Sequence, residues 1–265
     1  MKNLFKIFLL GIGLLPTALL SEDWPTYRYD SRRSGVSSEA LDLPLSPAWR
    51  VQGGTPRQAW SGPAKWDAYS GNKDLQSMRN FDPAFFVTAA NDSVYYGSSV
   101  DNAAHCLDAR TGSERWVSFA GGAVRLPPTI VDKKAYFGSD DGNVYCMNAA
   151  NGSLTWKYRP SPSGERVIGN GRMISLWPVR TGLLLEGGTL FLAAGIFPYE
   201  GIYVAAVDAQ TGKEIWLNDT AGDQAWGHQY GGMAPQGYLV ASSENLFVPT
   251  GRGMPAAFDL SLIHI

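Results

Sequence analysis

The chain has 265 residues, of which 45% are hydrophobic and 17% are charged, and its net charge is −2. This balance argues against nucleic acid as a partner, because phosphate binding requires a basic surface. Two cysteines cannot build a disulfide scaffold, and three histidines leave little material for a metal cluster. Thirty glycines and 16 prolines accompany 9 tryptophans, 12 tyrosines and 11 phenylalanines, a combination of turns and aromatic residues that favours an all-β fold.

Residues 1–21 are predicted to be a secretory signal peptide. Lys2 and Lys6 precede an apolar run over residues 7–20, which is shorter than the ~20 residues of a membrane span. A buried core helix is the alternative, but the basic flank and the terminal position disfavour it. Cleavage is expected near Ser21, and no cysteine for a lipid anchor follows the run. We therefore expect an exported protein, periplasmic or extracellular, with no membrane span after cleavage.

An eleven-residue pattern recurs three times after an N-terminal extension over residues 22–80. The copies lie at 106–116, 146–156 and 206–216. Each contains a glycine followed four positions later by a tryptophan, namely Gly112 and Trp116, Gly152 and Trp156, and Gly212 and Trp216. The first two copies are 40 residues apart and the next two are 60 apart, so the extra residues are expected within 161–186. A fourth copy begins at residue 246 and reaches residue 259.

Each copy is predicted to contain short strands joined by tight turns. In the second copy the strands are expected at 128–131, 134–138, 143–148 and 154–158. Asp141-Gly142 and Asn151-Gly152 supply the turn residues that tolerate a positive φ. A four-stranded antiparallel sheet every ~40 residues is typical of a propeller blade. We therefore predict an all-β fold, a β-propeller over residues 81–259 with blades near 81–120, 121–160, 161–220 and 221–259.

The repeated Asp-Ala-x-Thr-Gly-x-x-x-Trp pattern resembles the repeat of the pyrroloquinoline-quinone-type (PQQ-like) β-propellers, over about residues 81–259. That family includes quinoprotein alcohol dehydrogenases and the propeller lipoprotein of the outer-membrane β-barrel assembly machine. The resemblance implies that the glycine closes a turn and the tryptophan docks one blade on the next, usually in a ring of eight. Residues 23–35 look like the opening of secreted propellers of this kind. Residues 45–51, around Trp49, resemble a lone outer strand that would complete the last blade of a closed ring.

The last six residues, 260–265, read Leu-Ser-Leu-Ile-His-Ile. The codons CTG TCT CTT ATA CAC ATC would encode this string, and they resemble the transposon end used to build sequencing libraries. A natural strand end is the alternative, but the repeat demands a polar Thr-Gly turn after Phe258-Asp259. We interpret residues 260–265 as a sequencing-adapter artefact. On that interpretation the natural protein is longer, and the chain is an open arc with about four blades of an expected eight.

Two cysteines and one acidic turn are the first candidates for chemistry. Cys106 and Cys146 occupy equivalent places in neighbouring copies, too far apart for a disulfide, so two buried free thiols are expected. The resemblance implies that dehydrogenases of this family carry adjacent cysteines, a calcium ion and a catalytic aspartate. No adjacent cysteines occur here, and Asp140-Asp141-Gly142 is interpreted as a hairpin turn rather than a calcium loop. We expect no catalytic residue, metal or cofactor in this chain, and pyrroloquinoline quinone with calcium only if the full-length protein is an enzyme.

Candidate ligand contacts lie in the long connections that enter each blade. Such connections gather around one mouth of a propeller, where polar and aromatic side chains bind ligands. The candidates are Arg125, Trp177, Arg180, Trp226, His228 and Tyr230. The alternative is that the arginines cap carbonyl groups and neutralise acids inside the ring.

Three functions follow from these observations. The leading prediction is an exported propeller that acts as a binding or assembly scaffold, with a protein or polymer ligand at its mouth. The first alternative is the N-terminal half of a quinone-dependent oxidoreductase. The second is a carbohydrate- or polymer-binding propeller, which the aromatic residues of the inserted loops suggest.

Overall fold

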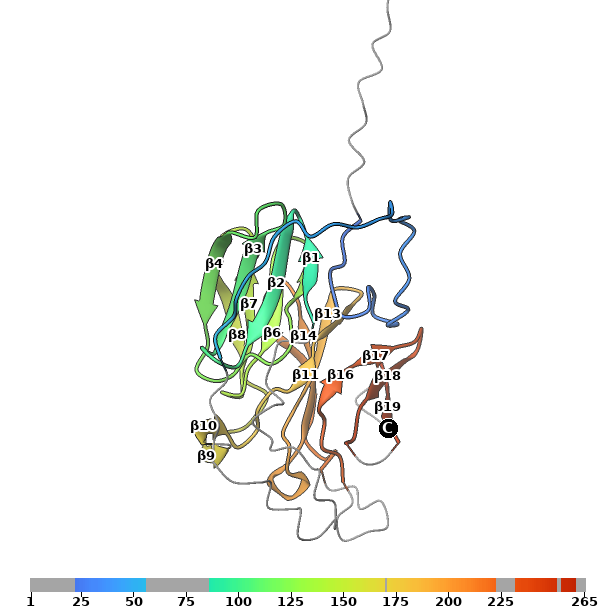
Figure 1. The fold of residues 1–265 in the computed structure, drawn as a ribbon. Coiled ribbons are helices and arrows are strands. Elements are labelled where there is room, and N and C mark those ends of the chain that lie inside the picture. Colours follow the sequence, from blue (N-terminus) through green and yellow to red (C-terminus); the bar gives the residue numbers. More distant parts are fainter. Residues whose placement is uncertain (1–21, 56–85, 170, 223–231, 252–253, 261–265) are drawn as a thin grey trace, which may run out of the picture.

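The computed structural model describes residues 22–55, 86–169, 171–222, 232–251 and 254–260, and Figure 1 shows their arrangement. Within these ranges the regular structure consists of β-strands and one short 3₁₀ helix, η2 (Pro198–Glu200). None of the described segments forms a helix long and apolar enough to cross a membrane. The predicted all-β fold class is therefore confirmed.

Four antiparallel sheets follow one another along the chain, each with its strands in sequence order. The first sheet contains β1 (Thr88–Ala90), β2 (Ser93–Ser98), β3 (Ala103–Asp108) and β4 (Glu114–Phe119). The second contains β5 (Thr129–Val131), β6 (Lys134–Gly138), β7 (Val144–Asn148) and β8 (Leu154–Tyr158). The third contains β12 (Leu184–Glu186), β13 (Thr189–Ala194), β14 (Tyr203–Asp208) and β15 (Glu214–Asn218). The fourth contains β17 (Val240–Ala241), β18 (Asn245–Val248) and β19 (Ala256–Asp259).

The extra residues of the third copy form a small projection. The hairpin β9 (Arg166–Gly169) and β10 (Arg172–Ser175) lies inside the segment 161–186, where the insertion was expected. It is followed by β11 (Thr181–Gly182), which pairs in parallel with β16 (Gly237–Tyr238). The β9–β10 hairpin stands apart from the four larger sheets in Figure 1.

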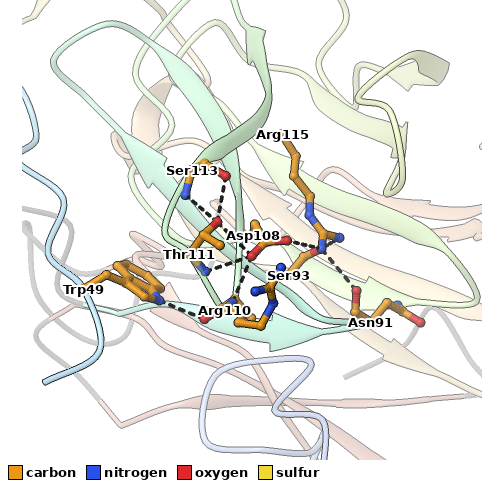
Figure 2. A network of polar contacts seen from close by, with 9 residues as sticks. Trp49, Asn91, Ser93, Asp108, Arg110, Thr111, Ser113 and Arg115 are labelled. Carbon is orange, nitrogen blue, oxygen red and sulfur yellow. Dashed lines mark hydrogen bonds and ion pairs between the residues drawn. The ribbon is translucent and has the colours of Figure 1, made fainter. Parts of the chain in front are cut away.

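Asp108 organises the turn between β3 and β4 (Figure 2). Its Oδ1 accepts hydrogen bonds from the Thr111 backbone N–H at 2.8 Å and from the Thr111 hydroxyl at 2.9 Å. Arg115 donates to Oδ2 at 2.7 Å, and this contact together with Thr111 holds the pKa of Asp108 below its ordinary value. The Gly112 N–H then donates to the Asp108 carbonyl at 2.8 Å. The same bond, at 2.8 Å, recurs in the next two sheets, from Gly152 to Asn148 and from Gly212 to Asp208.

Tryptophan side chains connect each of these turns to the element before it. The Trp116 indole N–H donates to the Ala149 carbonyl at 2.8 Å, across the boundary between the first and second sheets. Trp156 makes the equivalent bond to Ala209 in the third sheet at 3.1 Å. Trp49 makes it to Ala109 in the first sheet at 2.8 Å, although residues 45–51 belong to no β-strand. Trp216 instead packs against Phe191 in the core shared by the third and fourth sheets.

Each boundary between neighbouring sheets is filled by a buried apolar cluster. Adjacent residues of a strand point to opposite faces, so Phe137 joins the cluster beside the first sheet while Tyr136 joins the cluster beside the third. The two cysteines occupy equivalent places in β3 and β7 and each faces the next sheet, so Cys106 lies in the former cluster and Cys146 in the latter. Both are free and buried, as expected from the sequence.

Residues 22–35, which we call the strap, connect all four sheets. Its contacts reach the first strand of the first three sheets and the start of the fourth. They are the paired backbone bonds between Trp24 and Ala89, and the bonds of Pro25 with Ile130, Ser31 with Glu186 and Ala241, and Arg33 with Leu239. The strap therefore covers one end of the strands in all four sheets. This is the end at which the β1–β2 turn lies.

Candidate functional site

At the opposite end of the strands lie the β2–β3, β6–β7 and β13–β14 turns and the connections between sheets. Antiparallel strands alternate in direction, so these turns and connections come together at one end, which we call the mouth. Backbone hydrogen bonds link them there. The Ser175 backbone N–H donates to the Asp140 carbonyl at 2.7 Å, and the Val179 backbone N–H donates to the Ser139 carbonyl at 3.0 Å. The mouth lies at the bottom of Figure 1.

A buried carboxylate at the mouth holds two arginines from different connections. Arg125 lies between β4 and β5, Arg180 lies just before β11, and Asp140 is in the β6–β7 turn. Arg125 Nη2 is 2.8 Å from Asp140 Oδ2, and Arg180 Nε is 2.8 Å from Asp140 Oδ1. The Asp140 side chain is only 1% exposed. Burial opposes its ionisation, but Arg180 and then Arg125 outweigh burial and hold its pKa below the ordinary value.

This cluster connects three loops through one carboxylate and two guanidinium groups. An ionised carboxylate that is paired on both oxygens is a poor proton acceptor, so the cluster is not a general base. Two of the predicted ligand residues, Arg125 and Arg180, are thus brought together by Asp140. This is the arrangement of the alternative interpretation, in which the arginines neutralise an acid.

The other predicted ligand residues are placed differently. Trp177 is 6% exposed, its indole N–H donates to the Glu200 carbonyl, and its ring meets Tyr203 edge-on at 5.9 Å. Its ring therefore packs inside the loop structure of the mouth. Trp226, His228 and Tyr230 lie outside the described residues.

The adjacent turn residues do not fit a calcium ion. Asp141 Oδ1 accepts the Asn143 N–H at 3.0 Å, and its Oδ2 accepts the Gly121 N–H at 3.0 Å and the Tyr145 hydroxyl. The carboxylates of Asp140 and Asp141 thus face donors, whereas calcium requires several free oxygen ligands. Across the described ranges, no group of three or more His, Cys, Asp and Glu residues could hold a metal. The hairpin-turn prediction agrees with Gly142 at φ +83° between β6 and β7.

Exposed apolar side chains at the mouth were not predicted from the sequence. Ile168 and Met173 are cross-strand partners on the β9–β10 hairpin, and both are exposed, Ile168 by 81%. Phe119 at the end of β4, Phe197 just before η2 and Tyr199 within η2 are exposed too. We call these five side chains the apolar mouth face. The available signal was the two short apolar pairs of the insertion, Val167-Ile168 and Met173-Ile174, but such pairs do not say which residue of each faces solvent.

Arg172 fixes the hairpin that carries two of these side chains. Its guanidinium donates to the Ser99 carbonyl and, at 3.2 Å, to Asn102 Oδ1 in the β2–β3 turn. The insertion between the second and third sheets is thereby attached to the first sheet. Ile168 and Met173 are presented on a supported hairpin.

Comparison with known proteins gives relatives of several activities. One is tetrathionate hydrolase of Acidithiobacillus ferrooxidans, 30% identical over 143 residues, which is 48% of this chain and 25% of that protein. Another is the dehydrogenase subunit of the quinone alcohol dehydrogenase of Komagataeibacter europaeus, 29% identical over 150 residues, 49% of this chain and 19% of that protein. The chain therefore spans about a quarter or less of the length of these two relatives.

Structural comparison supports the architecture. The quinohemoprotein alcohol dehydrogenase from Comamonas testosteroni aligns with a TM-score of 0.57 at 17% identity, covering 85% of this chain and 35% of that one. At this identity the likeness concerns the fold. Residues 48–261 match the PQQ_2 family, described as "Outer membrane protein assembly factor BamB". Since this match covers most of the sequence, the chain belongs to that family of PQQ-like β-propellers.

Proposed function

We propose that this protein is an exported propeller scaffold that binds a protein partner through the apolar mouth face. The observation that carries the proposal is the exposed pair Ile168 and Met173 on a hairpin anchored by Arg172. Large apolar side chains exposed at one end of a protein mark a candidate protein–protein interface, because the centres of such interfaces are rich in aromatic residues and Met. The charged groups beside them are paired with each other, so they are suited to holding the loops in place. The description of the family favours a component of outer-membrane protein assembly as the partner.

Site-specific photo-crosslinking in the exporting cell tests this proposal. A crosslinker at Ile168 or Tyr199 is expected to capture the same protein. Leu154 is the matched control, because it is apolar and 56% exposed but lies at the start of β8, at the end away from the mouth. Equal capture from position 154, or no capture from either mouth position, would contradict the proposal. Retention on a polysaccharide that depends on the same two positions would favour the polymer-binding alternative.

A quinone-dependent oxidoreductase is the second candidate, and the observation that favours it is the 29% identity to a quinone alcohol dehydrogenase subunit. Titrating the purified chain with pyrroloquinoline quinone and calcium separates the two functions. The scaffold proposal expects no saturable binding in the micromolar range. Saturable binding accompanied by dye-linked alcohol oxidation would favour the oxidoreductase.

A further inference from the structure

The strap begins at a cluster of acidic and hydroxyl groups around Glu22, which we call the corner. The Glu22 carboxylate accepts hydrogen bonds from the Tyr29 hydroxyl, the Ser37 hydroxyl and the Ser38 backbone N–H. The bonds from Ser37 and Tyr29 lower the pKa of Glu22 to about 2. This carboxylate therefore stays ionised and holds residues 22 and 37–38 together.

A second carboxylate meets the backbone nitrogen of the same residue. The Glu22 N–H donates to Glu39 Oε2 at 3.0 Å. Neither Glu22 nor Glu39 has an ion-pair partner in the part of the chain that the structure describes. The Glu39 carboxylate thus lies next to this nitrogen atom without a charged partner, and a positive charge on the nitrogen would compensate it.

The chain is held in place from this point onward. Asp23 Oδ1 accepts the Asn91 N–H at 3.1 Å, and Trp24 exchanges two backbone bonds with Ala89, at 2.7 and 2.9 Å. A cut after Glu22 would remove the corner, and a cut before Ser21 would leave a neutral peptide nitrogen facing Glu39. A start at Glu22 is thus the one that keeps these contacts and places a charged nitrogen beside Glu39, whereas the sequence indicates only that cleavage falls near Ser21, because Leu19 is a poor match to the small-residue rule.

We infer that the mature protein begins at Glu22 and that its new α-ammonium group forms an ion pair with Glu39. Hydrolysis of the Ser21–Glu22 bond consumes one water molecule and leaves a carboxyl group on Ser21 and an amine on Glu22. The amine takes up a proton at neutral pH and occupies the place from which the peptide N–H reaches Glu39. Removal of the leader thereby supplies the charge that fixes the start of the strap. This inference rests on the predicted export of the protein.

The intact mass of the exported full chain gives the first test. A mass that begins at Glu22 is expected. A mature chain that starts at any other residue, or a chain that keeps residues 1–21, overturns the inference. Neither result bears on capture at the mouth, so failure of the inference and failure of the proposed scaffold function are distinguishable.

The reactivity of the α-amine gives the second test. A nearby carboxylate stabilises the ammonium form, so acylation of the α-amine by an N-hydroxysuccinimide ester at pH 7 is expected to be about three-fold faster in Glu39→Gln. Glu165→Gln removes an exposed carboxylate on the distant side of the molecule, before β9, and should leave the rate unchanged. Equal rates in Glu39→Gln and the unchanged protein overturn the ion pair.

Discussion

The indole of Trp116 lies over Gly152 so closely that a Cβ atom on that glycine would stand 2.7 Å from Trp116 Cδ2. Gly152 also has φ +70°, which side chains of L-residues disfavour. The glycine is therefore required twice, once by the turn and once by the ring above it. The same relationship occurs between Trp156 and Gly212 and between Trp49 and Gly112, each with a 2.6 Å approach.

Comparing Gly152→Ala with Gly187→Ala separates the effect of the positive φ from the effect of the tryptophan ring. Gly187 has φ +56°, but a Cβ there would meet nothing within 4 Å. We expect Gly187→Ala to lower the free energy of unfolding by about 1 kcal/mol. Gly152→Ala should cost about 1–3 kcal/mol more, because the ring of Trp116 has to move. Urea unfolding followed by tryptophan fluorescence measures both, and equal losses would contradict the docking role.

Trp116→Phe and Trp49→Phe test the indole hydrogen bonds. Phenylalanine keeps an aromatic ring over the glycine but removes the donor to the carbonyl group. Ala149 is buried, and in Trp116→Phe its carbonyl would keep only the long 3.4 Å bond from the Tyr95 hydroxyl, so we expect this variant to lose about 1 kcal/mol of stability. Ala109 is exposed and water can replace the donor, so Trp49→Phe should lose less. The order of the two losses in chemical unfolding decides the prediction, and the reverse order would refute it.

Asp140→Asn is expected to destabilise the protein at neutral pH by about 3–5 kcal/mol, because it removes the buried negative charge that Arg125 and Arg180 share. The pKa of Asp140 is lower in the folded protein than in the unfolded chain. Its stabilising effect is therefore complete above the unfolded pKa of about 4 and is lost as the pH falls through the folded value.

The pH profile of unfolding checks this assignment. Below about pH 4 the stability of Asp140→Asn should fall less steeply than that of the unchanged protein. Asp92→Asn, in the exposed β1–β2 turn, is the control and should follow the unchanged protein at every pH. Parallel profiles for the unchanged protein and Asp140→Asn would show that this carboxylate is not the group that titrates.

Contacts within one repeat could be predicted from the sequence, because they depend on local turn chemistry. In the second sheet the expected strands 128–131 and 143–148 differ from the observed Thr129–Val131 and Val144–Asn148 by one residue each. Gly142 and Gly152 have the positive φ values that their turns require. The strand period and the glycine positions carry this information without reference to the rest of the fold.

Contacts between repeats could not be predicted in the same way. Arg125 and Arg180 were recognised as candidates, but that both bind Asp140 depends on how three loops of different sheets meet at the mouth. The bond of Arg33 to the Leu239 carbonyl spans 206 residues of sequence, and no local pattern indicates it. Such pairs are determined by the distances between sheets, which the period of the repeat does not specify.

Arg33 provides the last prediction, because it is the buried anchor of the strap. Its Nε donates to the Leu239 carbonyl at 2.8 Å, and its Nη1 donates to Thr26 Oγ1 at 2.9 Å and to the carbonyls of Tyr27 and Asp30 at 3.0 and 3.1 Å. All four acceptors are neutral, and burial lowers the pKa of Arg33 to about 10. The planar guanidinium reaches these acceptors on two sides at once, which a lysine ammonium cannot do.

Arg33→Lys is therefore expected to lower the free energy of unfolding by about 2–3 kcal/mol and to release the strap from the fourth sheet. The exposed neighbour offers a matched control, since Arg32→Lys changes the same chemistry without a buried bond. Hydrogen exchange of residues 22–35 measures the release, and it should rise in Arg33→Lys but not in Arg32→Lys. If both variants exchange as slowly as the unchanged protein, the strap is held by its other bonds, to Ala89, Ile130, Glu186 and Ala241, and Arg33 is not its anchor.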